Sequence, residues 1–181
     1  SEMCIRDRYK TILSRTPLKD TEEHKLTGDG WNPASVVRAT TKIHGVPVSF
    51  LSLHICKSGA RDGHAYSLAT EVLPKETIER IIVVGDYNNK IGDAAMQTVE
   101  GAGFRSIWND LEIDVSEEFT YNAQDPQKNH GVIDHILYRA AAGSKATDGG
   151  IIELKNPLSD HKPIWAKIVF RRDLEAVRQS Q

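Results

Sequence analysis

The sequence predicts a layered α/β or α+β domain, because three features of the chain occur together. Short apolar runs rich in β-branched residues recur along the chain and have the length of strands. Two segments between these runs have apolar residues at the spacing of an amphipathic helix. The chain has 181 residues, of which 39% are hydrophobic and 27% charged, and this is enough for one domain with a hydrophobic core.

The N-terminal part of the chain contains a predicted β-hairpin. Residues 1–30 have no usable periodicity, and we interpret them as a poorly patterned or extraneous segment before the domain. Residues 35–55 form two β-branched runs joined at His44 and Gly45, which predicts a strand, a tight turn and a second strand. We therefore expect the domain to occupy residues 31–171.

The middle of the chain alternates between helical and extended patterns. Residues 62–79 have Ala, Leu and Val at helical spacing, and Pro74 is expected to end or kink this helix. Residues 78–86 contain a continuous apolar run, which suits a strand buried on both faces. Residues 92–102 suit a short helix with Asp93 in its first turn, where a negative charge is favourable.

The C-terminal part of the chain predicts further strands after a long polar segment. Residues 108–130 are acidic and typical of a loop. Strands are expected at residues 131–139, 149–154 and 162–170. A charged helical tail is expected over residues 172–181.

Charge and cysteine content restrict the possible functions. The formal net charge is -2 and the pI about 6.4, so the chain has no overall positive field that would attract nucleic acid or an anionic membrane. Cys4 and Cys56 are too few for a disulfide framework and lack the spacing of a zinc or redox motif. No apolar run approaches the roughly 20 residues that span a bilayer. The compartment and the oligomeric state stay open.

An acid and an amide follow the apolar run of residues 78–86. In extended backbone alternate residues project to the same side, so Asp86 and Asn88 are expected to share one direction while Tyr87 takes the other. Gly, Asp and Asn also favour turns for conformational reasons. A plain turn is therefore an equally good interpretation of this stretch when it is considered alone.

Further ionisable residues lie beside the other predicted strands. They are His54, Asp134, Asp160 and His161. Each is most simply a satisfied strand-edge residue or part of a turn, although Asp134 lies inside a strand and needs a partner if it is buried. With the acid and amide described above, they form a set of three acids, two imidazoles and one amide beside apolar strands. The set as a whole favours a functional site.

The tryptophans and a further histidine favour structural roles. Trp31, Trp108 and Trp165 are interpreted as core or partly buried packing residues, because large aromatic side chains mostly serve burial. His135 alternates with Asp134 along its strand, and we therefore predict that it lies at the surface.

Four short motifs occur along the chain in a specific order. They are "LHICKSG" at 53–59, "GDYN" at 85–88, "IDHI" at 133–136 and "SDH" at 159–161. In this order, over roughly residues 36–170, the chain resembles the endonuclease/exonuclease/phosphatase superfamily. This superfamily includes pancreatic-type deoxyribonuclease, abasic-site endonucleases, bacterial sphingomyelinases and inositol-polyphosphate phosphatases. The resemblance implies a four-layer sandwich of two β-sheets flanked by helices, incomplete at its N-terminus, with a divalent-metal site at one end.

The resemblance also implies catalytic roles for the matching residues. Asp86 would be the base that orients and deprotonates the attacking water, with Asn88 holding water or phosphate beside it. His161 would hydrogen-bond the phosphoryl oxygens, and Asp134 would support its imidazole. His54 would be the second phosphate-binding imidazole.

The expected cofactor is Mg²⁺, with Mn²⁺ as a possible substitute. By the resemblance Asp160 is a metal-linked acid, together with Asp86, and carboxylate and amide oxygens are the ligands that Mg²⁺ prefers. Lys57 lies where many bacterial members have "HLKSG" and is a further candidate phosphate contact. The implied activity is metal-assisted hydrolysis of a phosphodiester or phosphomonoester by an activated water. The implied substrate is nucleic acid, a phospholipid head group or a phosphorylated small molecule.

Part of the family pattern is not found in this sequence. Members carry an Asn on the first strand and a Glu, a principal metal ligand, upstream of the residue that matches His54. Glu22 and Glu23 lie in a polar stretch and are interpreted as solvated surface. The alternative interpretation is therefore a non-catalytic fragment or phosphate-binding module that lacks the upstream Glu.

Overall fold

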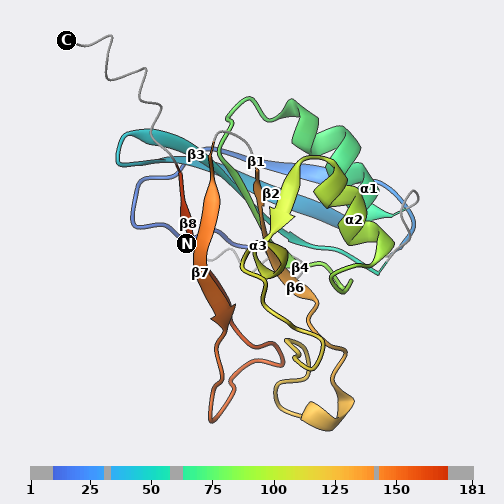
Figure 1. The fold of residues 1–181 in the computed structure, drawn as a ribbon. Coiled ribbons are helices and arrows are strands. Elements are labelled where there is room, and N and C mark those ends of the chain that lie inside the picture. The colour runs from blue at the N-terminus through green and yellow to red at the C-terminus, as the bar shows by residue number, and fades with distance from the viewer. Residues whose placement is uncertain (1–9, 31–33, 58–62, 141–142, 171–181) are drawn as a thin grey trace, which may run out of the picture.

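The computed structural model describes residues 10–30, 34–57, 63–140 and 143–170, which form two β-sheets and several helical segments (Figure 1). The larger sheet has six strands in the order β1-β2-β3-β4-β6-β5. Its strands are β1 (Lys19–Leu26), β2 (Ala34–Ile43), β3 (Val46–His54), β4 (Ile81–Asp86), β5 (Phe104–Ser106) and β6 (Asp134–Arg139). The smaller sheet pairs β7 (Lys145–Ile151) with β8 (Ile164–Val169). Trp31 and the predicted tail over 172–181 lie outside the described residues.

The helical segments cover one face of the six-stranded sheet (Figure 1). They are α1 (His64–Ser67), the π-helical turn η1 (Leu68–Val72), the 3-10 turn η2 (Leu73–Lys75) and α2 (Ala94–Gly101). Two further short helices, α3 (Ile107–Asp110) and η3 (Pro126–Lys128), precede β6. The two-sheet α/β architecture predicted from the sequence is therefore confirmed, and the described residues supply three of its four expected layers.

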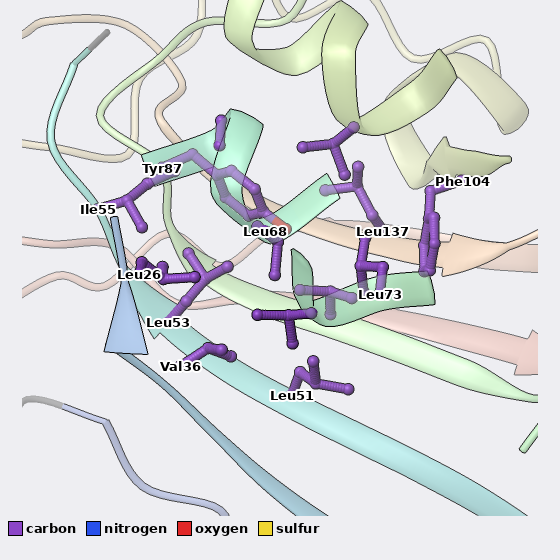
Figure 2. Packing of buried hydrophobic residues seen from close by; sticks show 14 of the residues in the cluster. Leu26, Val36, Leu51, Leu53, Ile55, Leu68, Leu73, Tyr87, Phe104 and Leu137 are labelled. Carbon is purple, nitrogen blue, oxygen red and sulfur yellow. The ribbon is translucent and has the colours of Figure 1, made fainter. Parts of the chain in front are cut away.

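Two hydrophobic clusters fill the two faces of the large sheet. On the helical side, Leu51, Leu53 and Leu137 pack with Leu68 and Leu73 (Figure 2). On the other side, Ile82, Ile136 and Trp108 pack against residues of β7 and β8. Neighbouring residues of β4 belong to opposite clusters, with Val83 on the helical side, so this strand is buried on both faces as its continuous apolar run predicts.

The tryptophan predictions can be compared with the structure at two positions. Trp108 is fully buried and is the largest side chain of its cluster. Trp165 in β8 is 41% exposed, so it is only partly buried. Both positions agree with packing roles.

Strand β1 is a correction to the sequence analysis, which placed residues 1–30 before the domain. In the structure β1 pairs antiparallel with β2 along the edge of the sheet, so at least residues 19–26 belong to the domain. Most of its side chains are exposed, and only Leu26 is buried. An edge strand is held mainly by backbone hydrogen bonds to one neighbour, so it needs no apolar alternation that sequence reasoning could detect.

The other predicted elements occur with shifted bounds. The hairpin turns at His44 and Gly45, which both have positive φ, as the tight turn requires. The helical segment runs from residue 64 to 75, so it ends just after Pro74. The strand predicted at 149–154 begins four residues earlier, at Lys145. Helix α3 lies partly inside the segment interpreted as a loop, and β5, just before it, was not predicted.

The topology brings three strand ends to one edge of the large sheet. Strands β3 and β4 are parallel, joined by the helical segment 64–75, so their carboxyl ends meet. Strand β6 runs antiparallel to β4, so its first residue lies at the same edge. Gly85 permits this close approach, because a Cβ at this position would lie 2.0 Å from the carbonyl oxygen of Leu53. None of the described helices has the length and apolar character needed to span a membrane.

Candidate active site

A single row of residues crosses the three strand ends. His54 on β3 pairs in register with Asp86 on β4, and Asp86 pairs with Asp134 on β6. Residues opposite each other in neighbouring strands project to the same face of a sheet. The row therefore presents one imidazole and two carboxylates at one edge, and Nε2 of His54 lies 3.3 Å from Oδ2 of Asp86.

The backbone turns immediately after Asp86. The amide N–H of Asn88 donates to Oδ1 of Asp86 over 2.8 Å, and Asn88 has a φ of 50°. The side-chain Nδ2 of Asn88 donates to the carbonyl oxygen of Ile55 over 2.8 Å and lies 3.4 Å from Oδ2 of Asp86. The stretch is thus a turn in which the acid and the amide lie together, while Tyr87 is buried in the helical-side cluster, as alternation predicts (Figure 2).

His161 joins this row from a distant part of the chain. Its Nδ1 lies 2.8 Å from Oδ2 of Asp134, within the hydrogen-bond distance of about 3.2 Å that a paired acid and imidazole require. Its Nε2 lies 3.7 Å from Oδ2 of Asp86, beyond a direct hydrogen bond. The structure therefore brings His54, Asp86, Asp134 and His161 together.

The loop that carries His161 is held by a segment that sequence reasoning did not single out. The carbonyl oxygen of Thr120 accepts from the N–H of Lys162 over 2.7 Å, and Tyr121 forms an isolated β-bridge with His161. The buried Thr120 hydroxyl accepts from the N–H groups of Ile133 and Asp134. One threonine thus connects the start of β6 with the His161 loop, and nothing in the polar composition of this segment indicates that connection.

The acid and the imidazoles have shifted pKa values with different causes. Burial, followed by the nearby Asp134 carboxylate, raises the pKa of Asp86 to about 6. The hydrogen bond to Asp134 raises the pKa of His161 above its ordinary value of 6.5. Burial, followed by repulsion from His161, lowers the pKa of His54. The site therefore favours a charged His161 beside a neutral His54.

The sequence profile of the Endonuclease/Exonuclease/phosphatase family matches residues 9–161, which is most of the chain. This chain belongs to that family. The family consists of hydrolytic phosphoesterases. The match includes β1, which agrees with the place of that strand in the sheet. No curated protein sequence matches the chain.

Solved structures of the family share the fold at low sequence identity. The mannosyl-6-phosphatase Bt3783 of Bacteroides thetaiotaomicron has a TM-score of 0.65 at 18% identity, with 84% of this chain and 67% of that chain covered. The human Nocturnin catalytic domain has a TM-score of 0.65 at 18% identity, with 87% and 61% covered. TDP2 of D. rerio, with a single-strand DNA product, has a TM-score of 0.64 at 16% identity, with 86% and 69% covered. The chain thus spans about two thirds of the length of these family structures.

Two further residues from the family motifs lie near the row. Asp160 is exposed, and its carboxylate contributes to the raised pKa values of both Asp86 and His161, which places it in the same electrostatic environment. Lys57 is exposed and lines a pocket together with Asn88. All seven residues singled out from the sequence therefore lie in or beside one site, while their individual roles stay predictions.

The donor set can be compared with the requirements of Mg²⁺. No group of three or more His, Cys, Asp or Glu side chains in the described ranges is arranged to enclose a metal ion. The oxygens of Asp86, Asn88 and Asp160 are nevertheless the donor type that Mg²⁺ prefers. This ion keeps several waters and needs only one or two carboxylates from the protein, so the chemistry of the residues fits it.

His135 is a correction, because it was predicted at the surface and is fully buried. Its Nδ1 accepts from Nε1–H of Trp108 over 3.1 Å, so its Nε2 carries the proton that it donates to the carbonyl oxygen of Asn89 over 2.7 Å. Alternation does place it on the opposite face from Asp134. That face is covered here, because neighbouring elements pack on both sides of β6.

Buried His135 is expected to make the folded chain less stable at acid pH. Burial lowers its pKa to about 4, whereas the unfolded chain takes up the proton near pH 6.5. The stability that the neutral form provides is complete above pH 6.5 and declines as the pH falls towards 4, by up to about 3 kcal/mol. Protonation of Asp86 stabilises the fold over the same pH range, so the decline is measured as the difference between the wild type and a His135 variant in urea unfolding at pH 7 and pH 4.5.

The variant His135→Gln isolates the contribution of this histidine. It is expected to be less stable at pH 7, because it disrupts the bonds to Trp108 and Asn89, but to lose less stability than the wild type between pH 7 and 4.5. If both proteins lose the same unfolding free energy between pH 7 and 4.5, His135 is not the cause of the pH dependence.

Proposed function

We propose that this chain hydrolyses phosphodiester or phosphomonoester bonds by attack of an activated water. The observation that supports this most directly is the convergence of Asp86, His54 and the Asp134–His161 pair at one edge of the sheet. A phosphate ester is shielded by anionic oxygens, so its hydrolysis requires a base for the water and cationic donors for those oxygens. In this proposal Asp86 is the base, and His54 and His161 are the donors to the phosphate oxygens.

Asp86 serves as the base in this proposal. Its Oδ1 is held by the N–H of Asn88, which fixes the carboxylate in one orientation. With a pKa of about 6, the carboxylate is mostly ionised at pH 7 and is a stronger proton acceptor than an ordinary aspartate. Asn88 lies beside it and positions the water or a phosphate oxygen.

The two imidazoles receive the phosphoryl oxygens. Because Nδ1 of His161 is hydrogen-bonded to Asp134, the Nε2–H of His161 is the donor available to the substrate. The raised pKa of His161 keeps that imidazole charged, and the charge becomes more valuable as the phosphoryl group gains negative charge in the transition state. Neutral His54 provides the second contact.

Mg²⁺ is the proposed cofactor, with Mn²⁺ as a substitute. The residues that would hold it are Asp86 and Asp160, with the amide oxygen of Asn88 close by. When bound, a divalent cation neutralises phosphate charge and polarises a phosphoryl oxygen. Lys57 supplies a further positive charge at the same pocket.

Two kinds of phosphate ester are candidate substrates. Among the similar structures, one is a mannosyl-6-phosphatase and another was solved with a single-strand DNA product, so the same fold accommodates a sugar phosphomonoester and a nucleic acid. This chain has no overall positive charge, which favours a small or short substrate over tight binding along a duplex.

Removal of divalent cations tests the proposal. Hydrolysis of bis(p-nitrophenyl) phosphate in the presence of Mg²⁺ is expected to fall at least about 100-fold when EDTA is added, because the cation stabilises transition-state charge by several kcal/mol. Excess Mg²⁺ added afterwards is the control and should restore the rate. Undiminished turnover in EDTA would refute the metal-assisted mechanism.

The same assay separates the enzyme from the alternative of a phosphate-binding module. A module would release no p-nitrophenol with either Mg²⁺ or Mn²⁺, yet would still bind inorganic phosphate in a calorimetric titration.

A further inference from the structure

A pocket opens directly beside the proposed catalytic row. Its volume is about 510 Å³, which lies in the range of sites that bind small ligands. Asn88, which lies beside Asp86 of the catalytic row, lines it together with Lys57, Lys90, Asp93, Tyr121, Asn129, His130 and Ile133. A phosphate group has five heavy atoms and, at about 30 Å³ for each water-sized atom, fills no more than about 150 Å³. The pocket therefore has room for substrate beyond the phosphate that reacts.

The ring of Tyr121 lies between those of His161 and His130. Its ring centroid lies 5.1 Å from that of His161 and 5.3 Å from that of His130. The tyrosine thus forms a wall that leads from the proposed phosphate-binding imidazole to the far side of the pocket. A substrate whose reacting phosphate contacts His161 would extend along this wall towards His130.

Lys90 also lines the pocket, and its side chain lies against Gly131, the residue after His130. A Cβ at Gly131 would lie 2.8 Å from Cε and 3.0 Å from Nζ of Lys90, so the ammonium group rests directly against the backbone of the residue after His130. Gly131 has a φ of 80° and, having no side chain, leaves the space that this ammonium group occupies. The glycine therefore helps to place a positive charge at a defined position.

The charges of the pocket are not balanced internally. Among the described residues, neither Lys57 nor Lys90 forms an ion pair, and the one lining carboxylate, Asp93, accepts from the backbone N–H of Lys90 over 2.8 Å. A neighbouring pocket of about 540 Å³ differs in this respect, because its Lys162 lies 2.6 Å from Glu153 and over the ring of Phe119. The pocket beside Asn88 therefore offers two cationic groups, Lys57 and Lys90, that no carboxylate of the described residues pairs.

We propose that this pocket selects substrates carrying a second phosphate group, which Lys90 and His130 bind while the first phosphate reacts at the catalytic row. The proposal rests on the proposed phosphoesterase function and specifies its substrate class. The second phosphate belongs either to a neighbouring nucleotide of a short polynucleotide or to a bisphosphorylated small molecule. The recognition chemistry is the same in both cases, since the Lys90 ammonium group binds phosphate oxygens through charge-assisted hydrogen bonds and an N–H of the His130 ring donates to them.

Two matched substrates test this selectivity at a constant scissile bond. They are thymidine 5′-(p-nitrophenyl phosphate) and the same ester with an added 3′-phosphate. For the wild type we expect kcat/KM to be about tenfold higher with the 3′-phosphate, the size of effect that charged hydrogen bonds give. In Lys90→Met the ratio should fall below about threefold, while the ester without the 3′-phosphate should react at the wild-type rate.

Two further variants serve as controls. Lys90→Arg keeps the positive charge and should keep most of the tenfold ratio. Lys155→Met removes an exposed lysine from the neighbouring pocket and should leave the ratio unchanged. Equal reactivity of the two substrates in the wild type, or an equal loss of the ratio in Lys155→Met and Lys90→Met, would overturn the proposal.

Further measurements distinguish a polynucleotide from a bisphosphorylated small molecule as the source of the second phosphate. They also distinguish a failure of the proposed function from a failure of this inference. If a glycerol 1-(p-nitrophenyl phosphate) gains as much from a 3-phosphate as the thymidine ester does, a bisphosphorylated small molecule is sufficient. A gain limited to the thymidine pair indicates a polynucleotide. If no ester is hydrolysed, the proposed function fails. Calorimetric titration with thymidine 3′,5′-bisphosphate and with thymidine 5′-phosphate then tests this inference by itself. Equal affinities for the two compounds would refute it.

Discussion

The variant Asp86→Asn is expected to lose turnover by about 10³-fold while its fold remains at least as stable as that of the wild type. The loss follows because an amide cannot accept the proton of the attacking water. The geometry is preserved, since the amide oxygen can still accept the N–H of Asn88 that now bonds to Oδ1. The rate is measured with bis(p-nitrophenyl) phosphate and Mg²⁺ at pH 7.

Stability should change in the opposite direction to activity. Burial and the neighbouring Asp134 raise the pKa of Asp86 to about 6, so the ionised carboxylate destabilises the folded state at pH 7 by up to about 3 kcal/mol relative to a neutral group. The neutral amide removes this penalty, and thermal unfolding should occur at the same or a higher temperature. Asp148→Asn, at an exposed carboxylate of β7, is the matched control and should alter neither quantity. A stable Asp86→Asn protein with wild-type turnover would exclude this residue as the base.

The variant Asp134→Asn is expected to lower kcat by about 10²-fold to 10³-fold and to change KM by less than about threefold. In the proposed mechanism Asp134 is a positioning residue, because it acts on the substrate through His161, whose Nδ1 lies 2.8 Å from its Oδ2. The charge that it supplies stabilises the imidazolium most when the phosphoryl group gains charge, so the loss appears in turnover rather than in substrate binding.

A second measurement distinguishes this role from a merely structural one. The hydrogen bond to Asp134 is the main cause of the raised pKa of His161, so in an NMR titration without metal this pKa should fall towards or below 6.5 in the variant. The unfolding free energy serves as the control for general damage. A kcat loss without any change in the titration of His161 would argue against orientation and charging of the imidazole as the role of Asp134.

Two features of the fold show what sequence periodicity can and cannot predict. Strand β4 was predictable because burial on both faces requires a continuous apolar run, and the structure confirms both faces. Strand β1 was not, because an edge strand with exposed side chains is specified by backbone pairing with β2, which leaves no apolar pattern. The error at His135 has a related cause, since alternation predicts the direction of a side chain but not what covers it.

The sequence by itself determined which chemical groups this chain places at its strand ends. The order of the motifs containing His54, Asp86, Asp134 and His161 was sufficient to indicate one site and the family, because residues at the ends of strands are fixed by the pairing of those strands. The side-chain types favoured a functional site, and the resemblance of the motifs to the family indicated phosphate chemistry.

Only the tertiary structure decided how these groups act on one another and what surrounds them. The register of three strands sets the row, and Thr120 brings the loop of His161 to Asp134 across 27 positions of sequence. The pocket with Lys90 and Tyr121 likewise forms only when the segment before β6 packs beside the site. Such contacts depend on distance and desolvation between residues far apart in the chain, and a linear pattern contains neither quantity.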